Sequence, residues 1–146
     1  MWKELRLAHY LGRGGEKNRT PLIHEPRQLR MLAKSKDAGI RFAVARSSCV
    51  TSEILWLLVQ DSSWPVRMAV AVSFAATEEM LLILLTDMEI PVREAAIRTQ
   101  LFQSINKVPL EIALRLSRDP SNVVREHFFA SKAFTYCKLS LYAACH

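Results

Sequence analysis

Apolar residues recur along the chain in short runs, spaced three or four residues apart. Two clear runs are Ile54, Leu55, Leu58, Val59 and Leu81, Leu82, Leu84, Leu85. This spacing puts the apolar side chains on one stripe of a helix. A helix of about ten residues is only about 15 Å long and is marginal by itself in water. The pattern therefore predicts short helices that depend on their neighbours.

Each run is followed by a polar corner and then by a second segment with small or branched residues at helical spacing. The positions expected to face inward are Ile40, Ala43, Val44; Val66, Ala69, Val70; Val92, Ala95, Ala96; and Val124, His127, Phe128. Thr51 and Thr77 stand where first helices need N-caps, and acidic residues follow in the first turn. Pro65 and Pro91 stand at the start of second segments, where a missing N–H costs nothing. Each unit thus predicts a helix, a tight corner and another helix.

Four such units share one sequence pattern, in which a leucine is followed nine residues later by an arginine preceded by Ile or Val. The arginines, called the ladder arginines below, are Arg41, Arg67, Arg93 and Arg125. Six residues before the last three of them stand Asp61, Asp87 and Asp119, whereas the first unit has Ser35 there. Successive units are 26, 26 and 32 residues apart. The chain is therefore an internal repeat with a longer third step.

One helix pair of this size cannot bury its apolar stripe, but pairs stacked side by side form a continuous core. We therefore expect an all-α fold: a right-handed α-solenoid of about four short two-helix repeats with N- and C-terminal capping segments. Residues 27–132 would form the repeats. Residues 1–26 would form an N-terminal helix and a basic loop, and residues 133–146 a C-terminal capping helix.

The repeat also carries a family resemblance. The pattern Leu-x-x-Asp-x-x-x-x-Val-Arg with an Ala-rich second helix resembles the HEAT-like repeats, and the stretch from Val66 to Leu81 is similar to the leucine-rich repeat variant family. The period of 26 residues is shorter than the roughly 40 of HEAT repeats and favours the variant. The resemblance implies a short α-solenoid, in which the second element of each repeat is either an α-helix or a 3₁₀ segment. The iron–sulfur cysteine cluster of some members has no counterpart, because residues 1–48 contain no cysteine.

The net charge of +6 is concentrated at one end of the sequence. Residues 1–46 hold 11 Lys or Arg against 4 Asp or Glu, whereas residues 47–146 hold 9 against 10. A basic end of this kind attracts nucleic acid, an acidic protein or an anionic membrane surface. The residues that would carry nucleic-acid binding are Arg13, Lys17, Arg19, Arg27, Arg30, Lys34 and Lys36.

The ladder arginines have two interpretations. In the first, each guanidinium pairs with the corner aspartate of its own or the neighbouring repeat and ties the corners together. In the second, the row of guanidiniums faces a phosphate backbone. The three aspartates favour the structural interpretation, because they neutralise most of the row.

One turn further along the second helices, outward positions carry mixed apolar and basic residues. The residues proposed to bind a partner are Phe42, Arg46, Met68, Val72 and Arg98. An exposed apolar strip flanked by charge typically docks a protein or a second copy of the chain. The alternative is that the N-terminal segment buries these side chains. Trp56 and Trp64 are expected to pack rather than to stack on bases.

No motif for catalysis, a metal or a cofactor is present. The histidines lie in no nucleophile or H-E-x-x-H pattern, and there is no dinucleotide-binding fingerprint. Three cysteines are too few for a disulfide scaffold and favour reduced thiols in a cytoplasmic protein, although Cys137, Cys145 and His146 leave a metal site open. The longest apolar runs fall far short of the about 20 residues that span a bilayer. We expect a non-enzymatic protein-interaction module without cofactor, with nucleic-acid binding as the alternative.

Overall fold

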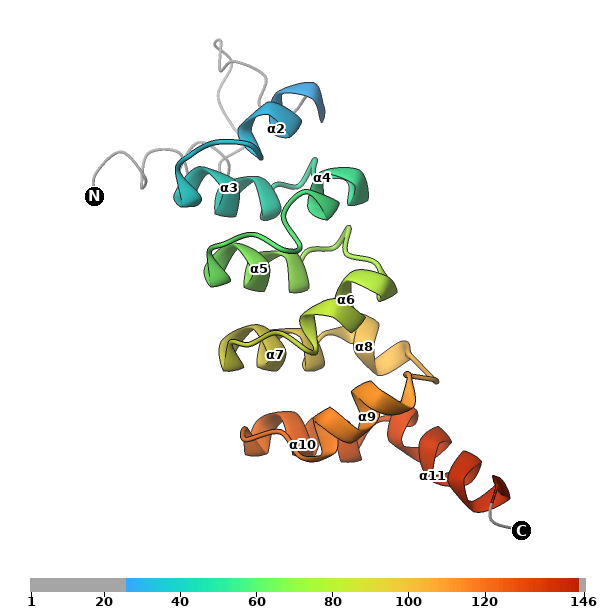
Figure 1. Ribbon diagram of the computed structural model, residues 1–146. Coiled ribbons are helices and arrows are strands. Elements are labelled where there is room, and N and C mark those ends of the chain that lie inside the picture. The colour runs from blue at the N-terminus through green and yellow to red at the C-terminus, as the bar shows by residue number, and fades with distance from the viewer. Residues whose placement is uncertain (1–25, 145–146) are drawn as a thin grey trace. The chain divides into compact units, whose positions relative to one another are not determined.

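The structure is a computed structural model that describes residues 26–144. These residues form ten helices and no strand, which confirms the expected all-α class (Figure 1). They divide between Ala75 and Ala76 into two compact units, unit 1 and unit 2, which are described separately below. The expected helix at residues 2–11 and the basic loop that follows it lie outside the described residues. None of the described helices is both long and apolar enough to cross a membrane.

Unit 1 contains the first two repeats. Its helices are α2 (Pro26–Leu32), α3 (Ala38–Ala45), α4 (Ser52–Trp56) and α5 (Trp64–Ala71). Helix α3 packs against α2 and, most extensively, against α5, and Figure 1 shows α3 and α5 lying one beside the other. The unit has a core of fully buried aliphatic side chains that come from all four helices and from the turn after α4. They are Leu29, Val44, Leu55, Leu58, Val66 and Val70.

Unit 2 contains the last two repeats and two further helices. Its helices are α6 (Glu78–Leu84), α7 (Ile90–Ile97), α8 (Gln100–Ser104), α9 (Leu110–Ser117), α10 (Asn122–Phe129) and α11 (Lys132–Ala144). Helix α10 packs against α7, α9 and α11. The largest buried side chains of the unit are Met80, Leu81, Leu84, Leu85, Ile97, Phe102, Leu116 and Phe128.

The second element of every repeat is an α-helix, not a 3₁₀ segment. Helices α3, α5, α7 and α10 each have eight residues, whereas the first helices α2, α4, α6 and α9 have seven, five, seven and eight. The longer third step of the sequence contains the short helix α8 and the loop after it. Residues added between repeats thus form an extra helix and do not interrupt the second helices.

The local signals in the sequence agree with the helix ends. The side chain of Thr77 accepts a hydrogen bond from the backbone N–H of Met80, whereas Thr51 caps α4 without a side-chain bond. Pro65 and Pro91 lie in the first two positions of α5 and α7. The C-terminal helix begins at Lys132, one residue before the expected 133.

Most positions expected to face inward are buried. The exceptions, Ile40, Ala95 and His127, are half-buried. Nδ1 of His127 lies 2.9 Å from the carbonyl oxygen of Val123. Since a carbonyl only accepts, Nδ1 carries the proton. The small buried residues of these helices include Ala43, Ala69 and Ala96, which allow close approach of the neighbouring helix.

Candidate interaction surfaces

In unit 1, Arg41 joins the two repeats. Its Nε and Nη2 donate to the two carboxylate oxygens of Asp61 at 2.6 and 2.8 Å, and its Nη1 donates to the carbonyl oxygens of Ser35 and Lys36. The side chains of Arg41 and Asp61 are only 13% and 6% exposed. One guanidinium therefore holds the corner of its own repeat with one edge and the aspartate of the next repeat with the other.

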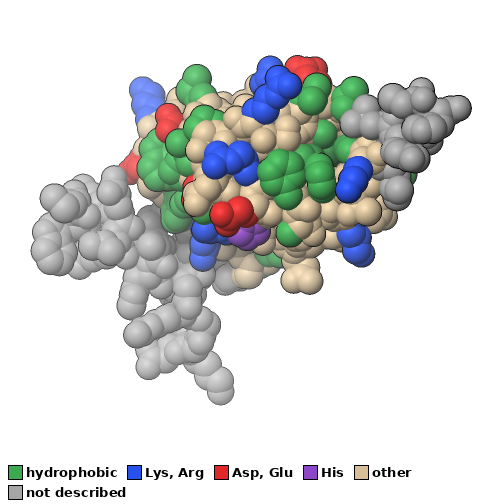
Figure 2. Space-filling model, turned by 90° about the horizontal axis from the view of Figure 1, so that it is seen from below, with side chains coloured by type: hydrophobic (Ala, Val, Ile, Leu, Met, Phe, Trp, Pro, Cys, Tyr) green, Lys and Arg blue, Asp and Glu red, His purple; other side chains and the backbone are tan. Residues whose placement is uncertain are grey.

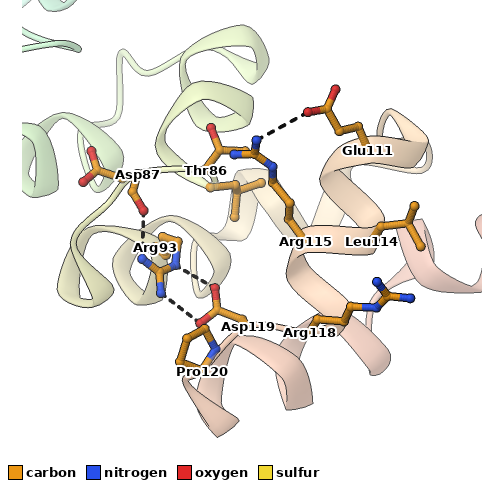
Figure 3. A pocket seen from close by; sticks show the side chains of 10 residues that line it. Thr86, Asp87, Arg93, Glu111, Leu114, Arg115, Arg118, Asp119 and Pro120 are labelled. Carbon is orange, nitrogen blue, oxygen red and sulfur yellow. Dashed lines mark hydrogen bonds and ion pairs between the residues drawn. The ribbon is translucent and has the colours of Figure 1, made fainter.

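Unit 2 repeats this arrangement in every contact. Arg93 donates from Nε and Nη2 to Asp119 at 2.6 and 3.0 Å, and from Nη1 to the carbonyl oxygens of Asp87 and Met88 (Figure 3). Both charged side chains are at most 10% exposed. Bidentate pairs of this kind fix orientation as well as distance. The structure thus brings ladder arginines together with the aspartate of the following repeat.

The corner aspartates also organise the helix that follows them. Asp61, Asp87 and Asp119 each accept the backbone N–H two residues later, at 2.9 Å in all three corners. In the first repeat Ser35 does the same with its Oγ, which accepts the N–H of Asp37 at 3.1 Å. Ser35 therefore keeps the role of the corner residue in the turn but offers no carboxylate to an arginine.

The remaining ladder arginines also hold their own corners. Nη1 of Arg67 donates to the carbonyl oxygen of Asp61 at 2.6 Å, and Nη1 of Arg125 donates to those of Asp119 and Pro120. Every ladder arginine therefore donates at least one hydrogen bond to a backbone carbonyl of its own corner. This leaves little of the row to face a phosphate backbone.

The pair in unit 1 shifts the pKa of both partners in the direction that favours their charged forms. The hydrogen bond to Asp61 raises the pKa of Arg41 above its ordinary value, against the opposing effect of burial. Burial by itself would raise the pKa of Asp61, but the bonds from Arg41 and from the backbone of Ser63 outweigh it, so the pKa is lowered. Asp61 is thus held ionised in the folded state.

Four of the five residues expected to bind a partner lie on the packed helices α3 and α5. Phe42 and Met68 are half-buried, and one turn later Arg46 and Val72 are the exposed C-caps of their helices. Residues four apart share one side of a helix. The two pairs are 26 residues apart and so occupy equivalent positions of neighbouring repeats. These four residues of the packed helices are called the α3–α5 surface below; Phe42 and Met68, expected to be exposed, are only half-buried in it.

Arg98 belongs to unit 2, where it is the exposed C-cap of α7. It occupies the position in its repeat that Arg46 and Val72 occupy in theirs. The structure describes the two units separately and so does not bring Arg98 together with the α3–α5 surface.

The described residues of the set expected to bind nucleic acid lie on and just after α2. Arg27, Arg30, Lys34 and Lys36 are all exposed, and none of them has an ion pair within the described residues. Leu29 and Ala33 of the same segment are buried, so the basic residues occupy the outer side. Met31, 76% exposed, lies among them. Arg13, Lys17 and Arg19 lie outside the described residues.

A pocket of about 510 Å³ opens in unit 2 beside the buried Arg93–Asp119 pair (Figure 3). Its lining adds Leu85, Thr86, Asp87, Glu111, Leu114, Arg115, Arg118 and Pro120. Nη2 of Arg115 lies 3.5 Å from Oε1 of Glu111 (Figure 3), and Thr86 donates its hydroxyl to the carbonyl oxygen of Ile83. Among the charged groups of the pocket, Arg93 pairs with Asp119 and Arg115 pairs with Glu111.

Several large apolar side chains are exposed that sequence reasoning did not assign to a surface. In unit 1, Trp56 and Trp64 are 45% and 40% exposed, although they were expected to pack, and Phe74 is 72% exposed two residues after Val72. In unit 2, Phe129 and Tyr136 are 46% and 44% exposed. Figure 2 shows hydrophobic side chains gathered with Lys and Arg side chains at the end of unit 2 that carries α10 and α11. The helical periodicity of the sequence does not predict these exposures, because it identifies the apolar side of a helix but not whether another element packs against that side.

Comparison of the chain with models of known families, with curated proteins and with solved structures finds no match. Within the described residues, no group of three or more His, Cys, Asp or Glu side chains could hold a metal ion. Of the residues considered for a metal site, Cys145 and His146 lie outside that range.

Proposed function

We propose that the chain is a non-enzymatic protein-interaction module with the architecture of a short α-solenoid, and that its α3–α5 surface binds a protein partner. The observation that supports the proposal is that the packed helices α3 and α5 carry Phe42 with Arg46 and Met68 with Val72 at equivalent positions, and that Arg46 and Val72 are exposed. The solenoid architecture is supported within each unit by the same arginine–aspartate contact between successive repeats.

The composition of the surface favours a protein over a small molecule. Phe42, Met68 and Val72 offer apolar area, and Arg46 adds an exposed cation at its edge. Protein interfaces are enriched in aromatic residues, Met and Arg, and depleted of Lys and Glu at their centre. A partner helix with an apolar stripe and one acidic residue matches this set.

The test is alanine substitution followed by pull-down of partners from the native source. F42A and M68A are expected to reduce capture of the partner by at least tenfold each, as for residues that carry most of an interface's binding energy. M31A is the matched control, because Met31 is more exposed than Met68 but lies on the basic side of α2. If F42A, R46A, M68A and V72A all capture the partner as the unmodified chain does, the α3–α5 surface is not the binding site.

The second candidate function is nucleic-acid binding. It is supported by the exposed residues Arg27 and Arg30, which lie three residues apart on α2, and by the exposed Lys34 in the turn just after that helix. If three phosphates are contacted, the affinity for duplex DNA should fall with a log–log salt slope of about −2.7. R27Q/R30Q should make that slope less negative by about two, whereas K138Q at an exposed site in unit 2 should leave it unchanged. Absence of binding at low salt would remove this candidate.

A further inference from the structure

Arg125 differs from Arg41 and Arg93 at one edge of its guanidinium. Its Nη1 donates to the carbonyl oxygens of Asp119 and Pro120, as Nη1 of Arg93 does to those of Asp87 and Met88. The edge formed by Nε and Nη2, which in Arg41 and Arg93 holds a carboxylate, has no such partner for Arg125 within residues 26–144. Arg125 is half-buried and its own corner fixes its position, so this open edge is preorganised.

The neighbouring position on the same helix is also uncovered. Four residues after Arg41 and Arg93 stand Ala45 and Ile97, which are both 0% exposed. The equivalent residue after Arg125 is Phe129, which is 46% exposed. Its ring contacts that of Phe134 from α11 at 5.0 Å between centroids, in an edge-on geometry that holds it in place. The side of α10 that carries Arg125 and Phe129 is therefore partly open to solvent, whereas the equivalent residues Ala45 and Ile97 are buried.

We propose that this face of α10 binds a protein segment that carries a carboxylate next to an apolar side chain, as the corner of a helical repeat does. The planar guanidinium edge fits a carboxylate with two parallel hydrogen bonds. The apolar side chain next to the partner's carboxylate packs over Phe129. The same chain uses this recognition twice, at Arg41–Asp61 and at Arg93–Asp119, which defines the geometry that the partner must meet.

The partner is a different protein and not a second copy stacked end to end. A copy that continued the repeat would bring its first corner to Arg125, and that corner carries Ser35 in place of aspartate. Ser35 uses its hydroxyl on the N–H of Asp37 and has no charge to offer a guanidinium. An open chain of copies, which head-to-tail contacts otherwise allow, is therefore disfavoured.

The probe is a peptide that copies the covering element of the last repeat. It spans residues 117–130, and a lactam joins Glu126 to a lysine introduced by N122K, so that the helix persists in isolation. Isothermal titration of the full chain with this peptide should give a Kd below about 1 mM. The D119N peptide should bind at least tenfold more weakly, because a hydrogen-bonded charge is lost.

Variants of the full chain localise the contact. R125Q should weaken binding about tenfold or more and should no longer distinguish the D119N peptide from its parent. R118Q, which removes the same charge from an exposed position of the same unit, should bind as the unmodified chain does. Lack of binding up to 1 mM, equal binding of the D119N peptide by the unmodified chain, or equal loss in R118Q would each overturn the proposal. The outcome is independent of the α3–α5 surface, since none of its residues is changed.

Discussion

Removing the charge of Asp119 should destabilise the protein far more than removing that of Glu111, although both carboxylates pair with an arginine in unit 2. The substitution is D119N, with E111Q as its control. Asp119 accepts three hydrogen bonds: from Nε of Arg93 at 2.6 Å, from Nη2 of Arg93 at 3.0 Å and from the N–H of Ser121 at 2.9 Å. Its side chain is 6% exposed.

The magnitude follows from what D119N leaves behind. An asparagine oxygen can keep the bond to the N–H of Ser121, but its amide NH₂ then faces a guanidinium that can only donate. Arg93, whose side chain is 10% exposed, keeps its charge without a counterion. Breaking one partner of a buried pair typically costs about 3–5 kcal/mol. Glu111 is 80% exposed and lies 3.5 Å from Arg115 across one helical turn, so E111Q should cost about 0.3–0.5 kcal/mol.

Urea unfolding followed by circular dichroism at 222 nm measures the difference. With a slope of about 2 kcal/mol per M, D119N should lower the midpoint by roughly 2 M and E111Q by about 0.2 M. The variant R93M should cost a similar amount to D119N, and the double variant R93M/D119N should cost less than the sum of the two. A D119N midpoint within error of the E111Q midpoint would refute the claim that the buried pair holds the repeats together.

Three further predictions concern other parts of the fold. The pKa of Asp61 is lowered on folding, so its ionisation stabilises the folded state above the unfolded pKa of about 3.9. This contribution is lost as the pH falls through the lower folded pKa. D61N should therefore flatten the dependence of the free energy of unfolding on pH in that acid range. T77A should cost about 0.5–2 kcal/mol in unfolding experiments, whereas T51A should cost less because the Thr51 side chain makes no capping bond. L84A should cost about 2–5 kcal/mol because Leu84 is fully buried, and L114A, at a site that is 47% exposed, should cost well under 2 kcal/mol by the same assay.

The sequence predicted the two helices of each repeat and most of their inward positions, because helical periodicity and capping residues act locally, but it did not predict α8 or that α4 ends at Trp56. Val66, Ala69 and Val70 are buried as their spacing predicts, and Thr77 and Pro91 stand at the helix starts that they signal. The architecture as a right-handed solenoid, the family resemblance and the protein-binding function stay predictions.

The partner of each ladder arginine could not be predicted, because an arginine is as close in sequence to its own corner as to the next one. The structure divides the two roles: the own corner supplies backbone carbonyls and the next corner supplies the carboxylate. The exposure of individual large side chains could not be predicted from the sequence either. Trp64 and Phe129 belong to helices whose other faces are buried, and only packing between elements decides which large side chains stay in solvent.

The position of the carboxylate, and not the length of chain between repeats, sets how successive repeats are aligned. Asp61 follows Arg41 by 20 residues and Asp119 follows Arg93 by 26, yet the Nε–Oδ2 distance is 2.6 Å in both pairs. The six additional residues are accommodated in unit 2 by α8 and its loop, and lengthening a closed loop from 20 to 26 residues costs only about 0.2 kcal/mol in chain entropy. A misaligned repeat would instead leave a buried guanidinium without its anion, at a cost of about 3–5 kcal/mol. Since the second cost exceeds the first by more than tenfold, the chain tolerates insertions between repeats but not a shift of the arginine relative to the aspartate.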